Sequence, residues 1–150
     1  MRYDRQMILP EIGEEGQRKL KQAKVLIVGV GGLGSPIALY LAGAGVGCIG
    51  LVDDDVVSIS NLQRQVLYSE KELGKPKAIC AAERLSALNS ETTSQPYPTR
   101  LTEENAQEII SQYDIVVDGC DNFPTRYLIN DICAKTGKVY VYGAICGFEG

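Results

Sequence analysis

The residues best suited to chemistry begin with a glycine-rich loop. Its pattern is G-x-G-G-x-G, with Gly29, Gly31, Gly32 and Gly34 as its glycines. The loop follows an apolar run at 24–28 that predicts a buried strand, and a predicted helix follows the loop. Glycines in this place let the backbone approach a phosphate, and Asp53, at the end of the next predicted strand, can bind a ribose. The pattern predicts a nucleotide site; the alternative is that the glycines only allow close packing of strand and helix, and that Asp53 starts a turn.

Two cationic sites follow, although the net charge of the chain is −4. Arg64 lies in the segment 60–65, and Lys77 lies in the segment Lys75-Pro76-Lys77. A pyrophosphate carries about two charges and is largely satisfied by a helix N-terminus, whereas a triphosphate carries about four. Arg and Lys are therefore useful to a triphosphate, and more so when attack at its α-phosphorus adds charge. The alternatives are a surface salt bridge for Arg64 and a solvated helix face for Lys77.

An acidic segment, 118–122, follows another predicted strand at the same edge of the sheet. Magnesium binds through one or two protein carboxylates together with substrate phosphates, so Asp121 is a candidate ligand. Asp121 could also be the N-cap of the next helix, and the two roles do not exclude each other.

Composition excludes several classes of function. The excess of acidic over basic residues argues against DNA or RNA as the main partner. The chain has no histidine and no C-x-x-C pair among its five cysteines, which excludes the usual zinc ligand sets and Ser-His or Cys-His catalysis.

Unpaired cysteines and a polar N-terminus favour a cytoplasmic protein over an exported one. From 25 to 52 no residue is charged, but the many glycines and Pro36 divide this stretch into strand, turn and helix, so no membrane span is expected.

Strands and helices alternate along the chain. Strands are expected at 24–28, 48–52, 115–117 and 138–142, and helices at 37–44, 76–88, 102–111 and 125–135. Ser35 is expected to cap the first of these helices, Thr102 to cap the third, and Gly137 to end the last. The alternation predicts an α/β fold with a doubly wound, mostly parallel, Rossmann-like sheet in one domain, 1–150, made of an N-terminal helical arm (1–23) and a core (24–150). The sequence stops directly after a strand, so we expect a C-terminally incomplete domain.

These motifs together resemble a known family. The N-terminal Arg2-Tyr3-x-Arg5-Gln6, the glycine loop, the segments 60–65 and 75–77, and Asp121-Asn122 are similar, in this order, to the ThiF, MoeB and HesA group of activating enzymes for sulfur-carrier proteins, which are related to ubiquitin-activating enzymes. The resemblance implies ATP-dependent adenylation of the C-terminal glycine of a small ubiquitin-like carrier ending in Gly-Gly, with release of pyrophosphate. The segments 38–47 and 53–55 look more like thiamin-pathway members than molybdopterin-pathway members.

The resemblance also implies roles for single residues. Gly32 would lie against the nucleotide, Asp53 would bind its ribose, and Asp121 would hold Mg²⁺. Arg5 would act in trans across a homodimer. The phosphates would be held by Asn61, Arg64 and Lys77, and the nucleotide site would further include Asp55, Gln65 and Asn122. A carboxylate nucleophile is already ionised at neutral pH, so the lack of histidine is no obstacle.

Full-length relatives also carry two C-x-x-C zinc motifs and, in many cases, a catalytic cysteine. Both lie C-terminal to Gly150 in the family, so zinc is expected only beyond this sequence. Cys48, Cys80 and Cys133 are expected in the core, and Cys120 and Cys146 lie near the predicted site without a fixed cation beside them. No catalytic thiol is assigned.

Three other functions are weighed against carrier adenylation. An NAD-binding Rossmann enzyme would not need Arg64 and Lys77. A non-catalytic partner subunit would not need to keep every phosphate ligand. An enzyme that adenylates a small carboxylate on tRNA would be expected to have a basic surface, which the composition lacks.

Overall fold

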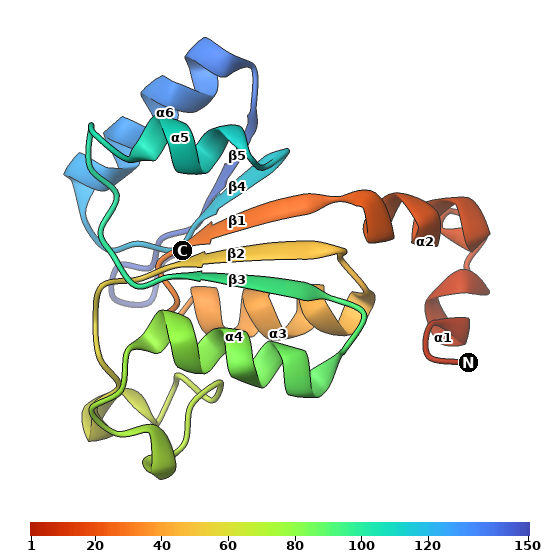
Figure 1. The fold of residues 1–150 in the computed structure, drawn as a ribbon, viewed down its shortest axis with the longest axis horizontal. Helices are drawn as coiled ribbons and strands as arrows, with labels where there is room; N and C mark the ends of the chain where they lie inside the picture. The colour runs from red at the N-terminus through yellow and green to blue at the C-terminus, as the bar shows by residue number, and fades with distance from the viewer.

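Five short parallel strands form one sheet in the order β3-β2-β1-β4-β5 (Figure 1). The strands are β1 (Lys24–Val28), β2 (Cys48–Val52), β3 (Thr93–Tyr97), β4 (Ile115–Asp118) and β5 (Val139–Tyr142). The structure, a computed structural model, describes residues 1–150. The doubly wound α/β fold is confirmed.

The central strand explains why both faces of the sheet are covered. Val25 and Ile27 belong to one buried apolar cluster, whereas Leu26 and Val28 belong to a second. Successive side chains of a strand point to opposite faces, so this uniformly apolar strand needs a layer of helices on each side.

Helices supply the two layers (Figure 1). The first cluster is completed by α3 (Gly34–Ala44) and α4 (Lys77–Leu88), and the second by α5 (Ala106–Ser111) and α6 (Phe123–Thr136). Two single-turn 3₁₀ helices, η1 (Ile59–Asn61) and η2 (Glu70–Glu72), lie in the long connection between β2 and α4. No helix combines the length and the apolar character that a membrane span requires.

The first residues form α1 (Asp4–Met7) and α2 (Gly13–Gln22), which lie beyond the amino ends of the strands (Figure 1). Gln6 and Gln17 both donate side-chain hydrogen bonds to the carbonyl oxygen of Ala44, at 2.7 and 3.1 Å. Asn89 donates to the hydroxyl of Tyr3 at 2.8 Å. The arm is therefore attached to the C-terminal end of α3 and to the end of α4.

Several local expectations are wrong. The strand β3 was not expected, because it is polar and contains Pro96. Ser35 does not cap α3: the N-cap is Leu33, and the Ser35 hydroxyl donates to the carbonyl of Val30 at 3.4 Å, inside the loop. The third expected helix begins four residues later, at Ala106, with Asn105 instead of Thr102 at the N-cap position. The Asn105 side chain also accepts the Thr102 amide at 2.8 Å.

Candidate nucleotide-binding site

A cavity of about 1290 Å³ opens at the carboxyl ends of the strands. Ligands bind at this place in open α/β sheets, because the order of the strands reverses here: the chain leaves β1 for β2 on one side, and the connection after β3 crosses to β4 on the other side of β1. The structure brings together eleven of the residues selected from the sequence. They are Gly29, Gly31, Gly32, Asp53, Asp55, Asn61, Arg64, Gln65, Lys77, Asp121 and Asn122. Arg5 and Gly34 do not line the cavity.

Two glycines of the loop, Gly29 and Gly34, are packed against backbone too tightly for a side chain. A Cβ atom on Gly34 would lie 1.9 Å from the carbonyl oxygen of Gly29, and one on Gly29, whose φ is +85°, would lie 2.9 Å from the amide nitrogen of Cys120. Gly34 therefore acts through packing beneath the loop. In the first turn of α3 the Ser35 amide already donates to the Gly31 carbonyl at 3.0 Å and Pro36 has no amide hydrogen, so the amides without a backbone partner are those of the loop residues 32–34. Free amides and the helix dipole at that place suit an anion.

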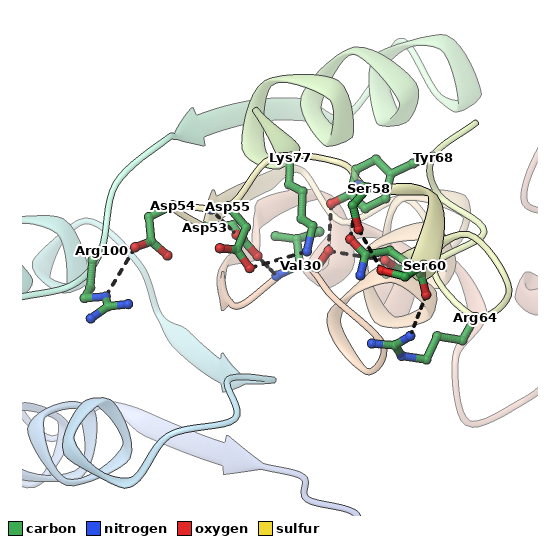
Figure 2. A network of polar contacts seen from close by, with 12 residues as sticks. Val30, Asp53, Asp54, Asp55, Ser58, Ser60, Arg64, Tyr68, Lys77 and Arg100 are labelled. Atoms are coloured by element: carbon green, nitrogen blue, oxygen red, sulfur yellow. Dashed lines mark hydrogen bonds and ion pairs between the residues drawn. The ribbon is translucent and has the colours of Figure 1, made fainter. Parts of the chain in front are cut away.

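Asp53 is fixed by backbone donors at the end of β2 (Figure 2). Its two carboxylate oxygens accept the amides of Val30 and Asp55, each at 2.8 Å. Burial raises the pKa of Asp53, although the two amides and the charge of Lys77 oppose that rise. A carboxylate has about four acceptor positions, so each oxygen can still accept a hydroxyl.

Lys77 begins α4 and places a nearly buried ammonium group in the cavity. Its side chain is 5% exposed, and its Nζ lies 3.5 Å from Oδ2 of Asp55, whose side chain is 73% exposed. Figure 2 shows Lys77 pointing toward Asp53 and Val30. An exposed carboxylate is a weak partner for a buried cation, because water screens the pair. The alternative for Lys77, a solvated helix face, is therefore wrong.

Arg64 stands on the other side of the glycine loop and is exposed. A Cβ on Gly32 would lie 3.3 Å from its Nε, and its Nη1 donates to the Ser60 carbonyl at 3.3 Å (Figure 2). No salt bridge involves Arg64, so the surface-pair alternative is also wrong. Its charge is available to a ligand over the loop.

Two amides flank Arg64. The Asn61 side-chain oxygen accepts the Ser58 amide at 3.3 Å, which leaves its NH₂ group as a donor. Gln65 is buried beneath the loop, with its Nε2 atom next to Gly31, and its Oε1 atom has no hydrogen-bond partner.

The opposite wall follows β4. The carboxylate of Asp121 is exposed and makes no hydrogen bond or salt bridge, whereas Asn122 is the N-cap of α6, because its side chain accepts the Thr125 amide at 3.0 Å. The capping alternative for Asp121 is therefore wrong.

Cys120 lies on the same wall. Burial raises the pKa of its thiol to about 12, and the nearby Asp118 contributes to the rise. The thiol therefore stays protonated at neutral pH.

Three carboxylates at the end of β2, those of Asp53, Asp54 and Asp55, lie within 4.8 Å of one another. Each already has a partner: backbone amides for Asp53, Arg100 at 3.3 Å for Asp54, and Lys77 for Asp55. Asp121 therefore remains the carboxylate most available to a cation among those lining the cavity.

Sequence reasoning missed three residues of the site. Tyr68 donates to the Val30 carbonyl at 2.7 Å and supports the glycine loop from below. Arg100, after β3, lines the cavity opposite Arg64. Arg126, on the first turns of α6, also lines it. Only Arg126 had a usable signal, because it stands one helical turn after Asn122 on a helix that starts at the site.

Comparison with known proteins decides the family. The sequence matches the ThiF family over residues 3–150. The chain belongs to the ThiF family. The resemblance drawn from the five motifs is therefore confirmed.

Individual ThiF-family relatives are similar over nearly the whole chain. A sulfur carrier protein adenylyltransferase of Thermus thermophilus is 56% identical over 149 residues, 99% of this chain and 55% of the relative. A probable molybdopterin-synthase adenylyltransferase of Porphyra purpurea is 51% identical over 99% of this chain and 39% of the relative. The crystal structure of E. coli tRNA N6-threonylcarbamoyladenosine dehydratase in complex with ATP has a TM-score of 0.89 at 28% identity, over 97% of this chain and 61% of that one. The chain thus spans about half, or less, of the length of the two adenylyltransferases.

Proposed function

We propose that this chain carries the ATP-dependent adenylation site of an enzyme that activates the C-terminal glycine of a small ubiquitin-like sulfur-carrier protein. The observation that carries the proposal is the nearly buried ammonium group of Lys77 in the same cavity as the glycine loop. A buried cation with only a weakly paired, exposed carboxylate beside it is costly to maintain unless an anion binds there. Together with Arg64 it matches the charge of a triphosphate better than that of a dinucleotide.

The residues fit ATP as follows. The glycine loop and the first turn of α3 receive phosphate oxygens, and Asp53 accepts the ribose hydroxyls with its remaining acceptor positions. The Asn61 NH₂ group, Arg64 and Lys77 hold the β- and γ-phosphates. Asp121, on the opposite wall, is a ligand for Mg²⁺, which would neutralise phosphate charge when bound. Three further residues support these groups: Gln65 beside the loop at Gly31, Asp55 beside Lys77, and Asn122 next to Asp121.

The reaction needs positioning and charge neutralisation more than proton transfer. The carrier's terminal carboxylate forms a bond to the α-phosphorus, and the bond from that phosphorus to the bridging oxygen of the β-phosphate breaks. Pyrophosphate leaves with the electrons of that bond, and Arg64 and Lys77 stabilise its charge. The attacking carboxylate is already ionised, so no general base is required. The cavity exceeds the ~300–1,000 Å³ of most small-molecule sites, which leaves room for a peptide terminus beside the nucleotide.

The names of the relatives also support one kind of macromolecular substrate. The T. thermophilus and P. purpurea proteins are named for carrier and molybdopterin-synthase adenylylation and are 56% and 51% identical, whereas the tRNA-modifying dehydratase is 28% identical. We therefore favour a carrier protein over tRNA, with Arg5 reaching the second site of a homodimer.

The proposal is tested by pyrophosphate exchange. Radiolabelled pyrophosphate should enter ATP only when Mg²⁺ and a matching carrier ending in Gly-Gly are present, with thiamin-pathway and molybdopterin-pathway carriers compared side by side. In parallel, ATP with Mg²⁺ at a hundred times its dissociation constant should stabilise the fold by about 2.7 kcal/mol, and NAD should not. Stabilisation by NAD but not by ATP would identify a dinucleotide enzyme. ATP binding without exchange for any carrier would favour a non-catalytic subunit.

A further inference from the structure

Arg126 is a cation that the proposed chemistry does not use. It projects from α6, and its side chain is only 14% exposed. Its Nη2 atom donates to two carbonyl oxygens, that of Cys120 at 2.6 Å and that of Gly143 at 2.8 Å. Its guanidinium also lies over the ring of Tyr142, 5.7 Å from the ring centre. Arg126 therefore joins the segment after β4 to the segment after β5.

Asp118 holds the same residue, Cys120, by its amide nitrogen. This carboxylate, at the end of β4, is buried. Its Oδ1 atom accepts the amide of Cys120 at 2.9 Å, and its Oδ2 atom accepts the hydroxyl of Tyr140 at 2.6 Å. Arg126 Nη1 lies 3.9 Å from the same Oδ2 atom. A buried carboxylate needs such partners, because an unpaired one would be strongly unfavourable.

Cys120 is thus fixed at both of its backbone polar groups. The next residue, Asp121, has a carboxylate with no partner of its own, and the residue after it, Asn122, is fixed as the N-cap of α6. The position of the Asp121 backbone, and with it the direction of its Cα–Cβ bond, is therefore set by its two neighbours. Groups behind a metal ligand commonly control its affinity in this way, by a factor of about 10–100.

We propose that Arg126 and Asp118 are positioning residues that fix the Cys120 peptide and thereby present the Asp121 carboxylate to the metal–nucleotide end of the cavity. This inference rests on the proposed function, in which Asp121 is the metal ligand. It assigns no contact between Arg126 and substrate. A lysine at 126 would keep the charge, but its single nitrogen cannot bind the two carbonyl oxygens as Nη2 does and also lie beside Asp118 as Nη1 does.

The test uses Mn²⁺ as the probe and water-proton relaxation as the readout, with a non-hydrolysable ATP analogue present. Arg126→Lys should raise the Mn²⁺ concentration at half-saturation about tenfold. Binding of the analogue without metal should change less than twofold. Arg84→Lys, on the exposed side of α4, is the matched control and should leave both values unchanged. Tyr140→Phe, which removes one hydrogen bond to Asp118, is the milder second variant and should shift Mn²⁺ binding in the same direction.

The double variant decides whether Arg126 acts through Asp121. Asp121→Asn should itself weaken Mn²⁺ binding, and adding Arg126→Lys to it should weaken binding no further. Unchanged Mn²⁺ binding in both Arg126→Lys and Tyr140→Phe would overturn the inference, as would equal losses with and without Asp121. Unchanged Mn²⁺ binding in Asp121→Asn alone would instead refute the metal assignment under the proposed function, and this inference with it. Melting curves of all variants distinguish these outcomes from unfolding.

Discussion

At the scale of single residues, the site depends on charges held away from water. Lys77 is nearly buried beside an exposed partner, and burial raises the pKa of Asp53 although two backbone amides stabilise its carboxylate. Both arrangements favour ligand binding over the stability of the empty protein, because each group would be better solvated at the surface. Substitutions here should therefore separate activity from stability.

Lys77→Met tests that separation. Methionine is one atom shorter than lysine, so it keeps most of the side chain while it removes the buried charge, and the free energy of unfolding should not fall. Pyrophosphate exchange should fall by about 10²–10³-fold, the usual loss when one electrostatic group is removed from an active site. Chemical denaturation and exchange assays measure the two effects.

The matched control is Lys75→Met, two residues earlier and exposed. Its exchange rate should stay within about twofold of the unsubstituted protein. Full exchange activity in Lys77→Met would remove Lys77 from the proposed chemistry.

Cys120 provides a pH-dependent test. Because burial and Asp118 raise the pKa of its thiol to about 12, only about one thiol in 10⁴ is ionised at pH 8. Its alkylation by iodoacetamide should rise about tenfold per pH unit up to pH 10, without the levelling that an ordinary thiol shows near pH 8.5–9. Peptide mass spectrometry gives the rate, with the exposed Cys146 as the control for reagent activity. Levelling of the Cys120 rate below pH 9 would contradict the raised pKa.

At the scale of elements, the junction of β1, α3 and β4 is made of glycine. Gly29, Gly34 and Gly119 lie against one another, and a Cβ on Gly119 would approach both the Gly29 carbonyl oxygen and the Gly34 amide to 3.1 Å. The loop after β1 and the loop after β4 can share one cavity only because no side chain separates them. The glycines thus fix the distance between the two walls of the site.

Replacing either of two glycines of α3 by alanine should change the free energy of unfolding, but in opposite directions. Gly34→Ala would place a Cβ 1.9 Å from a backbone oxygen and should lower the free energy of unfolding by more than about 3 kcal/mol. Gly43→Ala has nothing within 4 Å of the added atom and should raise it by about 1 kcal/mol, through the better helix propensity of alanine. Urea denaturation measures both. Equal effects would show that Gly34 is not needed for close packing.

Much of this fold could be predicted from the sequence, because strongly apolar strands and glycine-ended helices leave clear local signals. The edge strand β3 could not, since Thr93–Tyr97 is polar and half-exposed and owes its conformation to pairing with β2. The N-caps of the helices were also predicted wrongly, because tertiary contacts decide which of several suitable residues takes that position. Asp121 and Asn122 are both good capping residues, and only tertiary packing decides between them. Arg100 and Tyr68 enter the site through long connections that no local pattern specifies.

At the scale of the whole molecule, the two ends of the sheet have different tasks. The cavity lies at the carboxyl ends of the strands, and the N-terminal arm is attached beyond their amino ends (Figure 1). Arg5 is exposed on that arm, so it does not line the cavity of its own chain. Any action of Arg5 on a triphosphate must therefore come from a second chain.

Mixing two inactive variants tests this action in trans. Arg5→Ala and Lys77→Met should each lose exchange activity, and co-expression should restore it in mixed dimers. One of the two sites in a mixed dimer then combines an intact Lys77 with the partner's intact Arg5. Exchange activity per dimer, measured after separating dimers by two affinity tags, should reach about half the original value, an order-of-magnitude expectation for one working site of two. Mixed dimers without activity would refute the trans role.

The strand order also affects when the site comes into existence. The central β1 pairs with β2 soon after it in the chain, but its other neighbour, β4, starts only at Ile115. During synthesis the β1-β2-β3 half with α3 and α4 can therefore assemble first, and the β4-β5 half must dock later, since long-range pairing forms slowly. The cavity is bounded by both halves, so a nascent chain can acquire nucleotide affinity only when this last docking is complete.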